Sequence, residues 1–346
     1  MSQNIFQPTS PLFQKQTKKK WTQISNNPNF QTENNSGALD PIYFKEEVPA
    51  TNTFNKNGEW KICIEINIKN EKQANKQALE YLKLGVDTIS FLNFKNHDLS
   101  IILQDIQLDI IQINFIKFRN FKNIAEQLIE IATKKYGKKT LRNLSGYFGL
   151  GNIKTDDFLK FSKQLPNYRF FTINVNESKF LLKQLNYEDY LGSEVEYKQN
   201  IKHSIFKYIT YVFTISNQFL FEIGRLRAFR IAYEKKYKTS PYIKCIVSAE
   251  TKSIDPLIET TTKSISSILG GCNELVIKSK KDDTLNIKQQ LILKYESYFN
   301  RVADATHGSY YIDTLSYSMN RIKNNISDTN SGTNKEKNWD TFEEIR

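Results

Sequence analysis

The chain has 346 residues, of which 39% are hydrophobic and 25% charged, with only 13 glycines and 8 prolines. This composition provides enough apolar material for a sizeable core and excludes a wholly disordered or collagen-like protein. The length fits two ordinary domains, or one α/β barrel of about 250 residues with an arm. The formal net charge of +12 raises nucleic acid, a membrane surface or an acidic partner as candidate ligands.

The cysteines and the N-terminus indicate the compartment. Cys63, Cys245 and Cys272 are odd in number and far apart, so they form neither a metal-binding spacing nor a disulfide framework. Reduced thiols of this kind are typical of a cytoplasmic protein. The N-terminus lacks the charged and apolar regions of a signal peptide, and no apolar run approaches the ~18 residues of a membrane span. We therefore expect a cytoplasmic chain with no membrane partner.

Residues 1–45 read as an N-terminal arm that is polar overall but carries isolated large apolar side chains. Such side chains would anchor the arm on a partner or on the chain's own barrel, and a disordered leader is the alternative. The candidates for a partner interface are Phe13, Trp21 and Tyr43. At the other end, the composition of residues 323–346 predicts a polar C-terminal tail.

From residue 60 onward, strand and helix patterns alternate. Residues 60–68 carry isoleucines at every second position, which predicts a strand. Residues 71–84 have apolar residues at helical spacing and are followed by Gly85, a typical helix end. Residues 88–94 are β-branched and aromatic, which predicts a second strand. Strand, helix and strand in this order form a βαβ unit and require a parallel sheet.

The same alternation continues toward residue 300. Further strands are predicted at 110–116, 168–175, 209–215, 242–248 and 274–277, and further helices at 120–136, 217–237, 256–269 and 286–300. Repeated βα units over about 250 residues favour one closed (β/α)8 TIM barrel within residues 46–322. An open doubly wound sheet is the alternative, although the glycine-rich nucleotide-binding motifs are absent from the sequence.

Titratable residues do not form a recognisable active site. His97, His203 and His307 have no second His or Cys at metal-ligand spacing. Basic residues gather at 224–237, where they fall around the predicted helix and are expected to form a solvated or interface face. We therefore predict no catalytic, cofactor-binding or metal-binding residue in this chain.

Five segments, in order along the chain, resemble the methylmalonyl-CoA mutase family. The strongest is LILKYESYFNRVADATHGSYYID at 291–313, which contains the family's "ESY" and "GSYY" elements. The others are Trp21 with LDPIYF (39–44), EWKICIEI with the helix after it (59–91), NQFLFEIGRLRAFRIAY (217–233) and DPLIETTTKSISSILGGC (255–272). The resemblance covers about residues 12–320.

The resemblance implies a barrel that, in catalytic chains, threads a CoA ester through its centre beside a separate cobalamin domain. It also implies interconversion of succinyl-CoA and methylmalonyl-CoA by radical rearrangement, with adenosylcobalamin supplying the radical.

This sequence departs from the family pattern at the catalytic positions. Catalytic chains carry Arg, Gln and Tyr where this chain has Cys63, Ile64 and Glu65. A cysteine cannot supply the bidentate fork with which arginine holds a phosphate or carboxylate. The Tyr-His pair expected after a middle strand is replaced by residues 177–180, and the polar substrate segment before residue 168 has no counterpart.

The cobalt-binding part of the family pattern is also missing. No Asp-x-His-x-x-Gly motif occurs in the sequence, and Asp304 and His307 lie in the "SYY" turn, where they do not replace it. From the length of 346 residues we expect the family's barrel and arm without a cobalamin-binding domain.

We therefore expect the non-catalytic small subunit of a heterodimeric methylmalonyl-CoA mutase. It would hold no cofactor itself and would stabilise a large subunit that binds adenosylcobalamin. The alternatives are a stand-alone barrel enzyme or acyl-CoA-binding protein of unknown substrate and, from the charge alone, a nucleic-acid-binding protein. We also expect side chains such as Phe94 and Phe180 to plug the barrel.

Overall fold

A computed structural model describes most of the chain. The described residues are 17–25, 32–34, 37–39, 42–48, 58–149, 153–175, 206–250, 253–279 and 283–328. The chain forms two compact units, one of residues 52–307 and one that joins residues 1–51 to residues 308–346. The domain boundaries predicted after residues 45 and 322 stay predictions.

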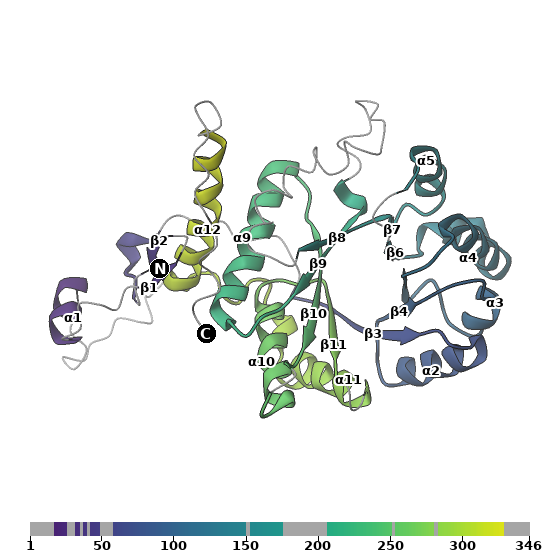
Figure 1. Cartoon of the computed structure of the whole chain (residues 1–346), viewed down its shortest axis with the longest axis horizontal. Coiled ribbons are helices and arrows are strands. Elements are labelled where there is room, and N and C mark those ends of the chain that lie inside the picture. Colours follow the sequence, from purple (N-terminus) through teal and green to yellow (C-terminus); the bar gives the residue numbers. More distant parts are fainter. Residues whose placement is uncertain are drawn as a thin grey trace, which may run out of the picture. The chain divides into compact units, whose positions relative to one another are not determined.

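The strands described in the larger unit pair in parallel, and helices lie outside them (Figure 1). Their order in the sheet is β7-β6-β5-β4-β3-β11-β10-β9-β8. Their bounds are β3 Lys61–Asn67, β4 Thr88–Leu92, β5 Gln112–Ile116, β6 Gly146–Gly149, β7 Tyr168–Arg169, β8 Phe171–Val175, β9 Ile209–Thr214, β10 Tyr242–Ser248 and β11 Glu274–Lys278.

The barrel closes because β7 and β8 are two halves of one strand, separated only by Phe170. β7 pairs with β6, and β8 pairs with β9. Between them, the Phe170 amide donates to the carbonyl oxygen of Tyr208 at 2.8 Å. With this composite strand the described residues form a ring of eight parallel strands. The predicted (β/α)8 barrel is therefore confirmed, and the open doubly wound sheet, which would leave two edges, is excluded.

The outer helices begin where side chains satisfy the first backbone amides. α2 (Glu71–Lys83) follows Asn70, whose side-chain oxygen accepts from the Gln73 amide at 3.2 Å. α10 (Pro256–Leu269) follows Asp255, which accepts from the next two free amides at 3.0 and 3.1 Å. The remaining helices described in this unit are α3 Leu99–Ile102, α4 Phe121–Tyr136, η2 Lys138–Arg142, α5 Thr155–Gln164, η3 Phe206–Tyr208, α9 Phe219–Tyr237, α11 Asp283–Leu291, η4 Ile292–Glu296 and η5 Phe299–Arg301.

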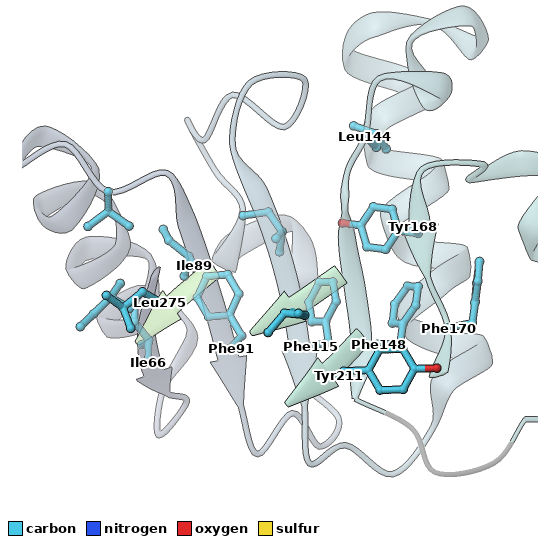
Figure 2. Packing of buried hydrophobic residues seen from close by; sticks show 14 of the residues in the cluster. Ile66, Ile89, Phe91, Phe115, Leu144, Phe148, Tyr168, Phe170, Tyr211 and Leu275 are labelled. Carbon is cyan, nitrogen blue, oxygen red and sulfur yellow. The ribbon is translucent and has the colours of Figure 1, made fainter. Parts of the chain in front are cut away.

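The apolar core lies between the strands and the helices, and much of it is aromatic (Figure 2). Phe91, Phe115 and Phe148 lie on adjacent strands, and their rings stack at centroid distances of 6.4 and 5.8 Å. Phe94 packs edge-on against Phe115 at 6.0 Å. Phe94 therefore belongs to the layer under the helices, and the prediction that it plugs the barrel is wrong. Phe180 lies outside the described residues.

The smaller unit joins the N-terminal arm to the last helix. It contains α1 Lys18–Ser25, the antiparallel pair β1 Thr32–Asn34 and β2 Gly37–Leu39, η1 Lys45–Glu47 and α12 Tyr310–Asp328. Lys18 forms an ion pair with Glu47 at 2.7 Å, and the Tyr43 ring lies 6.2 Å from the Tyr311 ring. α12 extends into the predicted tail as far as Asp328, and the rest of that tail lies outside the described residues.

The strands and helices predicted above are present in the structure, but β6, α3 and α5 were missed and the bounds of one helix differ. β6 was missed because its four residues begin and end with glycine, which weakens any strand pattern. The short helix α3 and the helix α5 were also missed. The helix predicted at 286–300 begins earlier, at Asp283, and its regular part ends at Leu291, where a wider π-helical turn over Ile292–Glu296 follows.

Candidate functional site

The side chains that point into the barrel are mostly polar. Residues paired across parallel strands face the same side, and the register groups Glu65 with Ser90 and Asn114, and Lys244 with Glu274. A barrel of this kind is usually filled by Val, Ile and Leu. Here those residues face the helices, and the interior holds a set of polar side chains that we call the interior network: Cys63, Glu65, Ser90, Gln112, Asn114, Tyr147, Arg169, Tyr242, Lys244 and Glu274.

The centre of the interior network is an ion pair between Lys244 on β10 and Glu274 on β11. The Lys244 ammonium lies 3.0 Å from Glu274 Oε1, and the two side chains are 1% and 0% exposed. Charges buried this deeply are stable only when they are paired and their remaining hydrogen-bonding capacity is used. The arrangement around both groups meets that condition.

Glu274 is surrounded by donors from strands on the far side of the barrel. Gln112 Nε2 donates to one carboxylate oxygen at 2.6 Å, and Asn114 Nδ2 donates to the other at 3.1 Å. The Tyr242 hydroxyl adds a third donor at 3.1 Å. With the Lys244 ammonium, four donors hold one carboxylate.

Lys244 reaches across the barrel in the same way. Its ammonium donates to the Tyr147 hydroxyl at 2.8 Å and to Ser90 Oγ at 3.2 Å. Cys63 Sγ lies 3.8 Å away and Glu65 Oε1 lies 3.7 Å away. These contacts connect β10 with β3, β4 and β6, so the network spans the cross-section of the barrel.

A second layer lies nearer the N-terminal ends of the strands. The Arg169 guanidinium stacks on the Tyr242 ring at 3.4 Å from its centroid, and its Nε donates to Thr210 Oγ1 at 3.2 Å. Lys61 Nζ donates to Gln112 Oε1 at 3.0 Å. This layer extends the network toward the N-terminal mouth of the barrel.

Burial and charge fix the protonation of the network. Burial alone would raise the pKa of Glu274, but the adjacent Lys244 ammonium holds it below its usual value. Burial alone would lower the pKa of Lys244, but neighbours that include the Glu274 carboxylate hold it well above its usual range. Burial raises the pKa of Cys63, Tyr147 and Tyr242. At neutral pH Lys244 and Glu274 therefore form an ammonium–carboxylate pair beside a neutral thiol and neutral phenols.

The charged and polar groups of the interior network are bound to one another and are not free to contact a substrate. A general base or nucleophile needs contact with the reacting atoms and a pKa suited to its task. Neighbouring side chains bury and contact each of the three candidates, which are Lys244, Glu274 and Cys63. These side chains fill the barrel interior, and their contacts connect strands on opposite sides of the barrel.

The buried thiols provide a direct test of this description. Cys63, Cys245 and Cys272 are each 0% exposed, and burial raises the pKa of Cys63 and Cys245. We expect the native chain to react with a thiol reagent at about pH 8 at least about a hundredfold more slowly than the chain in denaturant. Mass spectrometry at timed intervals measures this, and rapid labelling of Cys63 in the native chain would contradict it.

At the C-terminal mouth the network ends in an ion pair and a cavity. Glu65 Oε2 pairs with Lys278 at 2.8 Å. Beside it lies a cavity of about 310 Å³ between β3, α2 and the start of α11, with a largely polar lining. Its lining residues include Glu65, Asn67, Gln73, Gln77, Tyr81 and Asp283. The Tyr81 hydroxyl donates to Asp283 at 2.9 Å.

The predicted interface residues that the structure describes belong to the smaller unit, whereas the interior network belongs to the larger one. Trp21 lies on α1 and is half-buried. Tyr43 is half-buried as well, with Lys18 Nζ 5.8 Å from its ring centroid. Phe13 lies outside the described residues. Their role at a partner interface stays a prediction.

The basic helix is not the solvated face that the sequence predicted. Arg225, Arg227 and Arg230 on α9 are buried. Arg225 pairs with Glu222 at 2.6 Å, and Arg227 pairs with Asp304. The prediction is wrong for these arginines, because Arg225 is paired within its own helix and Arg227 is paired with a residue far along the chain, so that neither charge faces solvent. Asp304, singled out in the "SYY" turn, is held by this ion pair.

The interior network was missed, although a signal for it was present. A parallel strand covered on both faces is normally apolar throughout. β3 instead alternates, with isoleucines facing the helices and Lys61, Cys63 and Glu65 facing inward. That alternation in a parallel strand indicates a polar barrel interior, but only the apolar half of the pattern was used.

The described residues contain neither a cluster of metal ligands nor a membrane-spanning helix. Among the described residues, no group of three or more His, Cys, Asp or Glu side chains could hold a metal ion. No helix within the described ranges is both long enough and apolar enough to span a bilayer.

Comparison with known proteins shows to which family the sequence is similar. Residues 190–330 match the sequence profile described as methylmalonyl-CoA mutase. The methylmalonyl-CoA mutase small subunit of Porphyromonas gingivalis is 25% identical over 348 aligned positions, which cover 85% of this chain and 56% of that protein. The chain thus spans little more than half the length of this curated relative.

The solved structures that partly superpose on this chain include dihydropteroate synthases. The dihydropteroate synthase of Yersinia pestis is 10% identical, with a TM-score of 0.42 over 69% of this chain and 93% of that one. The dihydropteroate synthase of Anaplasma phagocytophilum is 14% identical, with a TM-score of 0.38 over 68% of this chain and 98% of that one. The fold assignment rests on the strand pairing and not on these scores. By its sequence, this chain is similar to the methylmalonyl-CoA mutase family, and the matched segments include the C-terminal half of the barrel.

Proposed function

We propose that this chain is the non-catalytic small subunit of a heterodimeric, adenosylcobalamin-dependent methylmalonyl-CoA mutase. The large subunit would bind the cofactor and isomerise succinyl-CoA and methylmalonyl-CoA, and this chain would stabilise it. The similarity to a protein named as a small subunit supports a partner chain. The three buried thiols support a reducing, cytoplasmic location.

The observation that carries the proposal is the filled barrel interior. The family resemblance implies that catalytic chains thread a CoA ester through the barrel. Here Lys244 and Glu274 lie in that space, held by donors and acceptors from three other strands, β4, β5 and β6. To admit an ester chain, the barrel would have to break a buried ion pair and leave its partners unsatisfied, which costs several kcal/mol.

The replaced catalytic positions support the same proposal. Cys63 and Glu65 stand where the resemblance places Arg and Tyr, and both face the barrel interior. Cys63 Sγ contacts Ser90 Oγ at 3.2 Å, and Glu65 pairs with Lys278. These side chains therefore bind their own neighbours, and neither offers the cationic fork that would hold a CoA phosphate or a carboxylate.

The residues of this chain do not fit a cobalamin site. The sequence has no Asp-x-His-x-x-Gly motif, and the Asp304 carboxylate pairs with Arg227. Adenosylcobalamin, held by the large subunit, would supply the radical. The role of this chain would be to form a buried interface with the large subunit and to stabilise its folded state.

Co-expression with the large subunit from the same genome tests the proposal. We expect the two chains to co-purify at a 1:1 ratio, with cobalamin retained only when the large chain is present. Failure of the chains to associate would contradict the proposal. Stoichiometric binding of succinyl-CoA to the isolated chain would instead favour an acyl-CoA-binding protein.

A further inference from the structure

Exposed cations gather at the N-terminal end of one half of the barrel, where helices end and the next strands begin. The residues are exposed in every case and form what we call the basic face: Lys134, Lys135, Lys138, Lys139, Arg142, Lys163, Lys207, Lys235, Lys236 and Lys238. They come from the end of α4 with η2, the end of α5, η3 and the end of α9. In a (β/α)8 barrel these segments all lie at the same end.

Contacts between these segments make the basic face continuous. Asn167 Nδ2, in the connection from α5 to β7, donates to the carbonyl oxygen of Arg142 at 2.6 Å. The Phe206 ring stacks on the Tyr237 ring at 3.8 Å, which joins η3 to the end of α9. The strands that follow, β6, β7 with β8, β9 and β10, are consecutive neighbours in the barrel.

Few carboxylates accompany these cations. Glu130 and Glu234 are the acidic residues in the segments that contribute to the basic face, which are 130–142, 163–169, 206–208 and 232–238. Glu234 accepts from Ser240 Oγ at 2.5 Å and lies 3.9 Å from Arg230. A helix dipole favours a cation in the last turn, but five cations within the nine residues from Lys134 to Arg142 exceed what one helix end explains.

The other half of the barrel has a different balance at the same end. Glu59, Asp87, Asp105 and Asp109 lie in its connections, and Glu59 and Asp87 pair with Lys294. Among the described connections at this end, the excess of cations therefore lies on one half of the barrel.

We propose that the basic face docks an acidic surface of the large catalytic subunit. This inference rests on the proposed function and names the surface through which the two chains meet. Opposite charges steer association and raise its rate, and the effect weakens as salt screens it. The basic face would thus raise the rate at which the two chains associate and fix their relative orientation.

An acidic protein surface fits this face better than nucleic acid does. Single strands bind where exposed aromatic rings stack on bases within a basic groove. The aromatic rings of the basic face are half-buried and engaged within the chain. The Tyr136 hydroxyl donates to the Ile106 carbonyl oxygen at 3.3 Å, and Tyr237 stacks on Phe206.

A four-site charge reversal tests the inference. The variant replaces Lys138, Lys139, Lys235 and Lys236 by Glu. The matched control replaces four exposed lysines of the other half, Lys69, Lys72, Lys76 and Lys95, by Glu. A second basic-face variant with Gln at the same four sites guards against misfolding, and circular dichroism checks that each variant is folded.

At about 50 mM salt we expect the basic-face reversal to slow association with the large chain by about tenfold or more. The control should change the rate by less than about twofold, and the difference should vanish near 500 mM salt. If the wild-type complex forms but the reversal leaves its rate within twofold, the docking inference fails and the proposed function stands. If no wild-type complex forms, both fail. Salt-sensitive binding of RNA or of anionic vesicles that the reversal abolishes, with an unchanged association rate, would assign the face to those partners instead.

Discussion

Replacing Glu274 by Gln is expected to lower the free energy of unfolding by about 3–5 kcal/mol, because it leaves the Lys244 ammonium buried without its counter-ion. The carboxylate accepts from Gln112, Asn114 and Tyr242 as well. An amide cannot accept all of these bonds and would turn an NH2 group toward donors. Urea unfolding of the purified chain measures the change.

Two comparisons show whether the loss belongs to the buried pair. The Lys160–Glu126 ion pair is about half exposed on both sides, so Glu126→Gln should change stability by less than about 1 kcal/mol. Removing both partners with Lys244→Met and Glu274→Gln should cost at least about 1 kcal/mol less than the sum of the two single changes. A Glu274→Gln chain as stable as the wild type would show that the interior network does not hold the barrel.

The same pair gives a pH dependence whose sign follows from the two pKa shifts. The pKa of Glu274 is lowered in the folded chain, so its contribution is complete above the unfolded value of about 4.3 and is lost as the pH falls through the folded value. The pKa of Lys244 is raised, so its contribution is present below about 10.4 and is lost as the pH rises through the folded value. Glu274→Gln should flatten the acid limb of the stability profile, and an unchanged limb would contradict the assignment.

Gly146→Ala is expected to destabilise the barrel by at least about 3 kcal/mol, since the added methyl group has no space. A Cβ at Gly146 would lie 1.8 Å from the Ile113 carbonyl oxygen and 2.8 Å from the Tyr168 ring. The neighbour is backbone of the adjacent strand β5, so a side-chain rotation cannot relieve the contact. β6 would have to separate from β5, which opens the barrel beside the composite strand.

Gly137→Ala serves as the matched control for this change. Gly137 ends α4 with φ of +82°, and a Cβ there would meet nothing within 4 Å. With ψ of 161°, its backbone conformation is essentially confined to glycine, so the substitution carries a backbone strain of about 1–3 kcal/mol and no crowding. Thermal unfolding of both variants separates crowding from backbone strain. Equal losses of stability in the two variants would mean that crowding at Gly146 does not cause the destabilisation.

The sequence predicted the barrel because its outer layer follows simple periodicities. α10 was placed at its observed ends, since Asp255 and Pro256 mark its start and Gly270 its end. The missed strand β6 shows the limit of this approach. Its place in the barrel is specified by Gly146 fitting against β5, which is a contact between strands and leaves no periodic signal.

The interior network could be predicted only in part. Alternation in β3 indicates which side chains face inward, but the pairing of Lys244 with Glu274 and with Ser90 depends on the register of strands far apart in the sequence. The buried arginines of α9 illustrate the same limit. Their charges looked like a surface in the sequence because the acceptors that satisfy them, such as Asp304, lie far along the chain.

Turnover measured with and without the large subunit tests the central claim most directly. The assay supplies succinyl-CoA and adenosylcobalamin to the isolated chain and to the reconstituted pair, and it follows formation of methylmalonyl-CoA. We expect turnover by the pair and none by the isolated chain, because the interior network occupies its barrel. Cobalamin-dependent turnover by the isolated chain would contradict the account.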